Sequence, residues 1–186
     1  MSTVDTIHRR RSIKRFTERA VSREEIERLL EAAVQAPNHR LTQPWRFYVL
    51  GPDARRAYGE VLGRRKARSV EDPAAAEAVV AKVAEEHARL PAMIAVAMTV
   101  ADDLEAREED YAATFMAIQN LALAAQEMGL GTHIKTGAVM SDPRARAAAQ
   151  VPDGQRIVAT VHLGEPAEVP APKARRSAAE STTWTQ

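Results

Sequence analysis

The sequence lacks cysteine, has few aromatic residues and carries no excess charge of either sign. Without cysteine, disulfides, thiolate metal sites and cysteine nucleophiles are excluded. With 26 basic and 25 acidic residues the formal net charge is +1, which argues against bulk attraction to nucleic acid or anionic membranes. The longest apolar run, 92–101, is far shorter than the ~20 residues of a membrane helix. The polar N-terminus holds no signal-peptide core. These absences predict a cytoplasmic protein without a nucleic-acid or membrane partner.

The hydrophobic core is expected to be thin. Apolar residues make up 45% of the chain, but 36 of its 186 residues are alanine, which leaves about a quarter as larger apolar side chains. Burial at a subunit interface or around a cofactor would add to such a core. The length fits a single domain over 1–186, in which 166–186 form an extended, proline-rich C-terminal segment.

Helix and strand patterns alternate along the chain. One helix opens with the Ser22–Glu25 capping box and ends before Pro37. Further helices are expected at 53–66, 74–90 and 108–128, with a short one starting near Pro143. Strands are expected at 46–50, 92–100, 132–136 and 156–163. Helix 108–128 is apolar nearly all round, so it lies in the interior or at an interface. Long helices between strands predict an α/β or α+β layered fold.

The densest polar feature is the basic run HRRRSIKRF at 8–16. Arginine forks beside a serine hydroxyl are suited to a compact phosphate. A solvated helix face or a nucleic-acid contact is the alternative, although no aromatic residues for base stacking are interleaved. A second basic element, KARR at 173–176, either belongs to a charged tail or returns to clamp the same phosphate. The residues alone leave these interpretations open.

The segment APNHRLTQPWRF at 36–47 connects a helix to a strand, where functional groups commonly lie. Its proline and tryptophan also fit a purely structural role as a loop anchor. Glycine-rich phosphate loops are absent, so a Rossmann site is not expected. The five histidines are scattered without metal-ligand spacing, and no metal site is expected.

Four segments occur in a characteristic order: RRSIKRF at 10–16, APNHRLTQPWRF at 36–47, GLGTHIKTG at 129–137, and HLGEP at 162–166 followed by KAR. Together they resemble the nitroreductase family, and most closely its compact YdjA-like branch, over about residues 5–176. The resemblance implies an α+β nitroreductase-like fold with a central, mostly antiparallel sheet flanked by helices. It also implies an intertwined homodimer with FMN at the subunit interface.

The resemblance assigns three groups of FMN-binding residues by position. One group, at both ends of the chain, holds the phosphate and ribityl chain: Arg10, Arg11, Ser12, Lys173 and Arg175. Lys14, in the same run, matches a further cationic position that reaches the flavin. A second group reaches the flavin from the partner subunit: Gln35, Asn38 and His39. A third lies along the flavin ring: Ile134, Lys135 and Thr136. The family residues that bind the pyrimidine edge of the flavin have no clear match in this sequence. The candidates for that role are Arg64, Arg65 and Lys66.

The activity implied by the resemblance is ping-pong hydride transfer from NADH or NADPH, through FMN, to a nitroaromatic, quinone or similar acceptor. Because the cofactor carries the redox chemistry, no catalytic side chain and no metal ligand is assigned. An FMN-binding or storage protein with little turnover is one alternative. A small nucleic-acid-binding protein that uses the run 8–16 is another.

Overall fold

A computed structural model describes residues 2–185, so residues 1 and 186, the two ends of the predicted domain, lie outside the described part. Its centre is a 4-stranded sheet in the order β1-β2-β4-β3, in which every neighbouring pair is antiparallel. The strands are β1 (Trp45–Val49), β2 (Ala92–Thr99), β3 (Gly131–Lys135) and β4 (Gln155–Gly164). Each lies within one residue of its predicted place, and the predicted α+β fold is confirmed.

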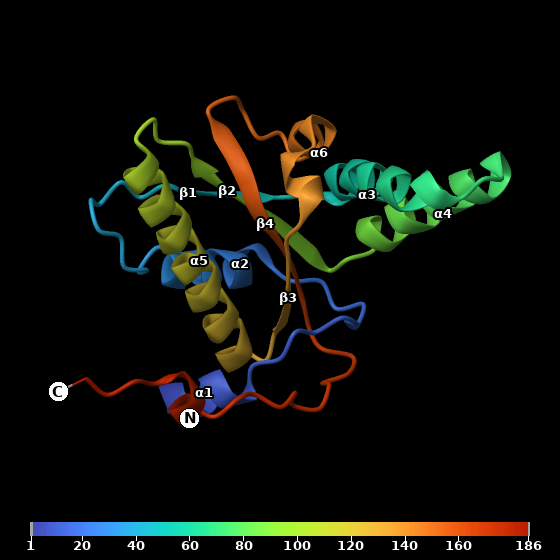
Figure 1. Ribbon diagram of the computed structural model, residues 1–186. Coiled ribbons are helices and arrows are strands. Elements are labelled where there is room, and N and C mark those ends of the chain that lie inside the picture. The colour runs from blue at the N-terminus through green and yellow to red at the C-terminus, as the bar shows by residue number, and fades with distance from the viewer. Residues whose placement is uncertain (1, 186) are drawn as a thin grey trace.

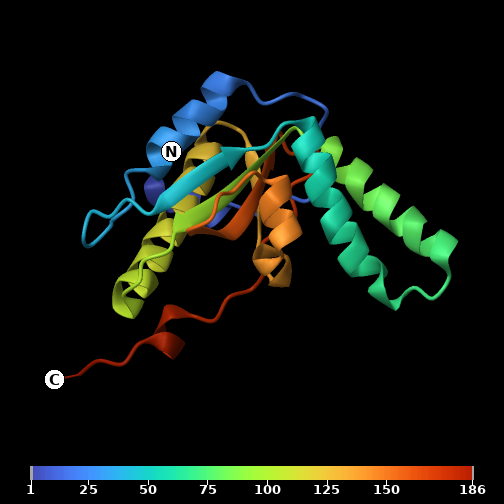
Figure 2. The same cartoon turned by 90° about the horizontal axis from the view of Figure 1, so that it is seen from above.

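Helices cover both faces of the sheet (Figures 1 and 2). One face packs on α2 (Arg23–Ala33) and α5 (Leu104–Glu127). The other packs on α3 (Pro52–Lys66) and α6 (Pro143–Ala148). The helix α4 (Pro73–Ala88) lies against α3, and together they form a hairpin that projects from the body on the side away from α5 (Figure 2).

The position of β2 in the middle of the sheet accounts for its continuous apolar sequence. Ile94 and Val96 belong to the core on the α5 side, whereas Met93 and Ala95 belong to the core on the α3 side. Successive side chains of a strand point to opposite faces. A strand covered on both faces therefore needs an apolar residue at every position, as the run 92–100 indicated.

Two helices differ from the sequence-based expectation. The helix α5 begins four residues before 108, because Asp103 caps it by accepting a hydrogen bond from the Ala106 N–H at 2.8 Å. Along α5, Tyr111 and Met116 remain 41% and 40% exposed. The helix α1 (Thr3–Arg9) was missed, although a Ser2 capping box starts it.

A row of three histidines lies between β3, β4 and the α3–α4 hairpin. The His87 and His162 ring centroids are 5.3 Å apart, and those of His133 and His162 are 6.1 Å apart. Burial lowers the pKa of all three, and that of His162 falls from 6.5 to about 2. The Nε2 atoms of His87 and His162 have no hydrogen-bond partner among the described residues. The row is therefore uncharged at neutral pH.

This row predicts that acid destabilises the protein well above the range in which carboxylates titrate. Below the ordinary histidine pKa of 6.5 the unfolded chain takes up a proton at His162 that the folded chain refuses until about pH 2, so stability falls as pH falls through this window. The variant His162→Asn should reduce the slope of unfolding free energy against pH by up to ~1.4 kcal/mol per pH unit. Urea unfolding at about pH 7, 6 and 5 measures this slope. The matched control is His8→Asn, at an exposed histidine, and equal slopes for the two variants would contradict the prediction.

Candidate functional site

An extended N-terminal arm, residues 10–17, joins the two ends of the chain. The Ile13 N–H donates to the Thr132 carbonyl of β3 at 2.9 Å, and the Thr17 N–H donates to the Glu165 carbonyl at 2.9 Å. The arm therefore lies between β3 and the segment that follows β4, where the blue and red ends of the ribbon meet in Figure 1.

Gly131, the first residue of β3, permits this close approach. A Cβ atom at this position would lie 2.8 Å from the Ile13 Cβ and 3.0 Å from the Pro166 Cγ. Such distances are below van der Waals contact, so a larger residue would push the arm and the C-terminal segment away from the strand. Gly131 therefore allows the arm and the C-terminal segment to pack against the start of β3.

A cavity of about 770 Å³ opens between the arm and the C-terminal segment. We call it the basic cavity. The five residues that the resemblance assigned to the phosphate and ribityl chain line it, together with Lys14, which was assigned to the flavin: Arg10, Arg11, Ser12, Lys173, Arg175 and Lys14. The two basic runs, which stand near opposite ends of the sequence, thus come together in one place. Ile7 and Pro170 add apolar lining that no sequence pattern indicated.

The positive charge of the basic cavity is largely unbalanced. Of its lysines and arginines in the part of the chain that the structure describes, only Arg15 pairs with a carboxylate, that of Glu168. Arg11 donates to the backbone carbonyls of His8 and Arg10 at 2.7 and 2.9 Å. Backbone carbonyls orient a guanidinium without neutralising it. Five cations in one cavity form a site for an anion of more than one charge.

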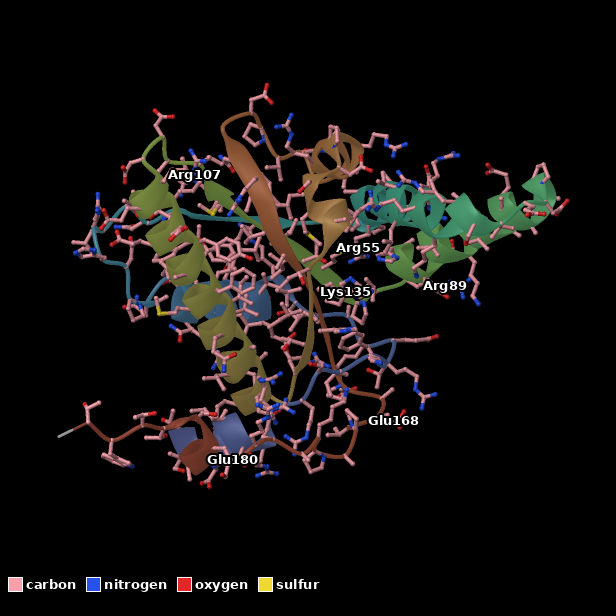
Figure 3. The ribbon with its side chains drawn as sticks, viewed as in Figure 1. Arg55, Arg89, Arg107, Lys135, Glu168 and Glu180 are labelled. Atoms are coloured by element: carbon pink, nitrogen blue, oxygen red, sulfur yellow. The ribbon has the colours of Figure 1, made fainter. Side chains whose placement is uncertain are left out.

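The positive charge continues onto the end of β3 and the residue that follows it, where the residues assigned to the flavin ring lie: Ile134, Lys135 and Thr136. Lys135 is half-buried near the middle of the view in Figure 3. Desolvation lowers its pKa, and so does the nearby Lys66 ammonium. Desolvation also lowers the pKa of His133, with further contributions from Lys135 and Lys14. Lys14 and Lys135 therefore flank the same imidazole, which connects the basic cavity with β3.

The candidates for the pyrimidine edge differ in what they contact. Arg64 lies 3.5 Å from Glu77, and Arg65 lies 3.8 Å from Asp142. Lys66 has no carboxylate within ion-pair distance in residues 2–185, and its charge acts on Lys135. Of the three, Lys66 is the cation directed toward β3.

The residues assigned to a partner subunit do not line the basic cavity of their own chain: Gln35, Asn38 and His39. They lie in and before the loop beside α5. The His39 Nδ1 is 2.9 Å from Glu109 and keeps the pKa of that carboxyl below its ordinary value. The Asn38 Oδ1 accepts the Gln43 N–H at 2.7 Å. Leu41, with a φ of 49°, holds a left-handed backbone conformation, a strain that commonly occurs at binding loops.

A second cavity, of about 590 Å³, adjoins the end of β3. Thr136 lines it together with Tyr111, Met140 and Arg156. We call it the Arg156 cavity. Sequence reasoning missed it, because its residues come from α5, from the segment that follows β3, and from β4, and share no local pattern.

Neither a metal site nor a membrane-spanning helix is found within residues 2–185. That range holds no group of three histidine, aspartate or glutamate side chains arranged to bind a metal ion. Within the same range, no helix has the length and apolar character required to cross a membrane.

Comparison with known proteins places the chain in a family. The model of the nitroreductase family matches residues 7–165. YfhC of Bacillus subtilis (strain 168), which carries the name of an NAD(P)H nitroreductase, is 34% identical over 172 residues, covering 92% of this chain and 88% of that protein. The crystal structure of a nitroreductase-like family protein from Bacillus cereus has a TM-score of 0.86 at 31% identity, covering 100% and 97% of the two chains. A Desulfovibrio desulfuricans protein named as a nitroreductase and crystallised with FMN has a TM-score of 0.74 at 27% identity, covering 100% and 98%. The chain therefore belongs to the nitroreductase family.

Proposed function

We propose that the protein is a single-domain, FMN-dependent oxidoreductase that passes electrons from NADH or NADPH to a nitroaromatic, quinone or similar small acceptor. Membership of the nitroreductase family supports the class of reaction. The NAD(P)H nitroreductase name of YfhC supports the reductant, and the FMN in the Desulfovibrio desulfuricans structure supports the cofactor.

The observation that carries the proposal is the unbalanced charge of the basic cavity. The phosphate of FMN is a dianion near neutral pH, and it is matched by five cations that have no carboxylate partner among residues 2–185. Arginine forks from the arm give two-point hydrogen bonds to phosphate oxygens, and the Ser12 hydroxyl adds a further donor. The residues present therefore fit the phosphate end of FMN, with Lys173 and Arg175 closing on it from the C-terminal segment.

The residues of β3 fit the ring end of the same cofactor. When bound, FMN supplies the two-electron redox chemistry, which no side chain of this protein provides. Lys135, half-buried and with Lys66 nearby, places a cation beside the segment assigned to the ring. Such a fixed charge stabilises negative charge on a reduced ring, because it needs no reorganisation during the reaction.

A second copy of the chain completes the site in this proposal. Gln35, Asn38 and His39 lie away from the basic cavity of their own chain. Met116, which lines a shallow pocket with Asn38 and His39, is an exposed apolar residue of α5, as expected of a helix that packs on a partner. A homodimer in which each loop reaches the neighbouring basic cavity accounts for both observations.

The function is tested by the absorbance spectrum of the purified protein. We expect a yellow protein whose visible flavin bands bleach under anaerobic conditions on addition of NADPH or NADH, and return when a quinone or nitroaromatic is added. A yellow protein that neither reductant bleaches would instead be a flavin storage protein. A colourless protein that does not take up FMN would contradict the proposal as a whole.

Replacement of Arg10 tests the phosphate assignment. The variant Arg10→Ala should weaken FMN binding by ~1.5–3 kcal/mol, the usual contribution of a hydrogen bond to a charged group. The measurement is the dissociation constant of FMN, obtained by fluorescence titration of the flavin-free protein. Arg23→Ala removes an exposed arginine of α2 that pairs only with Glu27 and serves as the control. An unchanged dissociation constant for Arg10→Ala would show that this guanidinium does not hold the phosphate.

Replacement of His39 tests the shared site. The variant His39→Ala should shift the flavin absorbance bands, whereas Arg40→Gln, which removes another partner of Glu109, should leave them in place. Equal shifts in both variants would indicate a disturbed loop and not a lost contact. Mixed dimers of Arg10→Ala and His39→Ala chains discriminate further: if His39 acts on the neighbouring subunit, one site of each mixed dimer carries neither change and binds FMN normally. No recovery in the mixture would place His39 in its own chain's site or in none.

A further inference from the structure

The Arg156 cavity lies where β3 ends, beside the segment assigned to the flavin ring. Its walls are the start of β4, the side of α5 that carries Tyr111, and the turn η2 (Ala138–Ser141) before α6. Its volume of about 590 Å³ lies within the ~300–1,000 Å³ of typical small-molecule sites.

Most ionised groups of this cavity are already neutralised. The Asp142 carboxylate accepts hydrogen bonds from the Arg144 side chain at 3.0 and 3.2 Å, and these keep its pKa below the ordinary range. Arg146 pairs with Asp153 at 2.7 Å. Arg156 differs, because within residues 2–185 no carboxylate lies at ion-pair distance from it. The cavity therefore holds one uncompensated positive charge, at a defined place.

An aromatic ring holds the Arg156 guanidinium in position. Its central carbon lies 5.1 Å from the centroid of the Tyr111 ring. The Tyr111 ring is itself packed at 4.9 Å, centroid to centroid, against Phe115. A guanidinium stacked on a ring keeps its N–H donors free along its edge, where a carboxylate binds in a two-point geometry.

The rest of the lining is suited to a flat apolar body. Met140 and Ile157 supply apolar surface next to the Tyr111 ring. The Thr136 and Ser141 hydroxyls also line the cavity, and in the described part of the chain neither makes an intramolecular hydrogen bond. An apolar wall, two hydroxyls and a fixed cation together select an aromatic molecule that bears an anionic group.

From this geometry we infer that Arg156 binds the carboxylate of an aromatic electron acceptor, so that the enzyme prefers acidic aromatic acceptors to neutral ones of the same shape. The inference rests on the proposed function, since Thr136 belongs both to the segment assigned to the flavin ring and to this cavity. Arg156 acts in it as a specificity-determining residue and takes no part in electron transfer.

A pair of acceptors that differ only in charge tests the inference. The holoenzyme is reduced with dithionite without air, and stopped-flow absorbance follows its reoxidation by 4-nitrobenzoate or by the methyl ester of that acid. In Arg156→Gln, the second-order rate constant for 4-nitrobenzoate should fall at least about tenfold, as expected for a lost charge-assisted contact, and that for the ester less than about twofold. The quantity compared is the ratio of the two constants in the variant against the same ratio in the wild type, because the different intrinsic reactivities of the two acceptors cancel in that comparison.

Two variants control for effects unrelated to the carboxylate. Arg23→Gln removes the same charge from the surface of α2 and should leave the ratio at its wild-type value. Arg156→Lys keeps the charge but loses the planar fork, and should give an intermediate ratio. If Arg156→Gln slows both acceptors equally, or neither, the inference is wrong. Thermal unfolding followed by circular dichroism confirms that the variants are folded.

Direct binding separates this inference from the proposed function. If the reduced protein is reoxidised by neither acceptor, the proposed function is wrong. Calorimetric titration with 4-nitrobenzoate then still tests whether the Arg156 cavity binds an aromatic carboxylate. Binding by the wild type and by Arg23→Gln, with loss in Arg156→Gln, supports the anion site without any turnover. Absence of binding by the wild type overturns the site even in an active flavoenzyme.

Discussion

The site depends on the backbone pairing of the N-terminal arm with β3 on one side and with the C-terminal segment on the other. Three hydrogen bonds hold it: Ile13 to Thr132, Thr17 to Glu165, and Ala167 to Arg15, at 2.9, 2.9 and 3.0 Å. The cations brought together repel one another, and nothing in their side chains would assemble them. Main-chain hydrogen bonds and the small Gly131 hold the cations close together. Binding of an anionic ligand would reduce the repulsion between them.

The core supports this arrangement with small residues and few acids. Alanine is abundant where helices meet the sheet, which allows close packing but buries little area for each residue. Behind β3, the histidine row stays uncharged because of desolvation, with Lys135 and the neighbouring imidazoles adding to the effect on His162. Because these imidazoles are uncharged, they add no charge behind β3.

One short strand organises both cavities. The basic cavity lies beside the start of β3, where the arm pairs with it, and the Arg156 cavity lies beyond its end. The residues assigned to the flavin ring follow one another from β3 toward the Arg156 cavity, and the last of them, Thr136, lines it. A cofactor held by its phosphate at one end of this strand would present its ring next to a space with a separate charge preference. In that arrangement cofactor binding and acceptor selection would rest on different arginines, so that either could change while the other is kept.

Interactions between residues that are near one another in the sequence determine most of the helices and strands of this protein. Periodicity and caps such as Ser22 placed the strands and most helices, since each depends on residues near in sequence, and the ordered motifs indicated the family and the residues of the basic cavity. The start of α5 was misplaced, because the cap Asp103 stands outside the apolar pattern. Only the tertiary structure decided that residues 10–14 and 173–175 line one cavity, and that Arg156 stacks on Tyr111. Such contacts join residues whose separation along the chain carries no periodic signal, and they exist only once the sheet has ordered its strands.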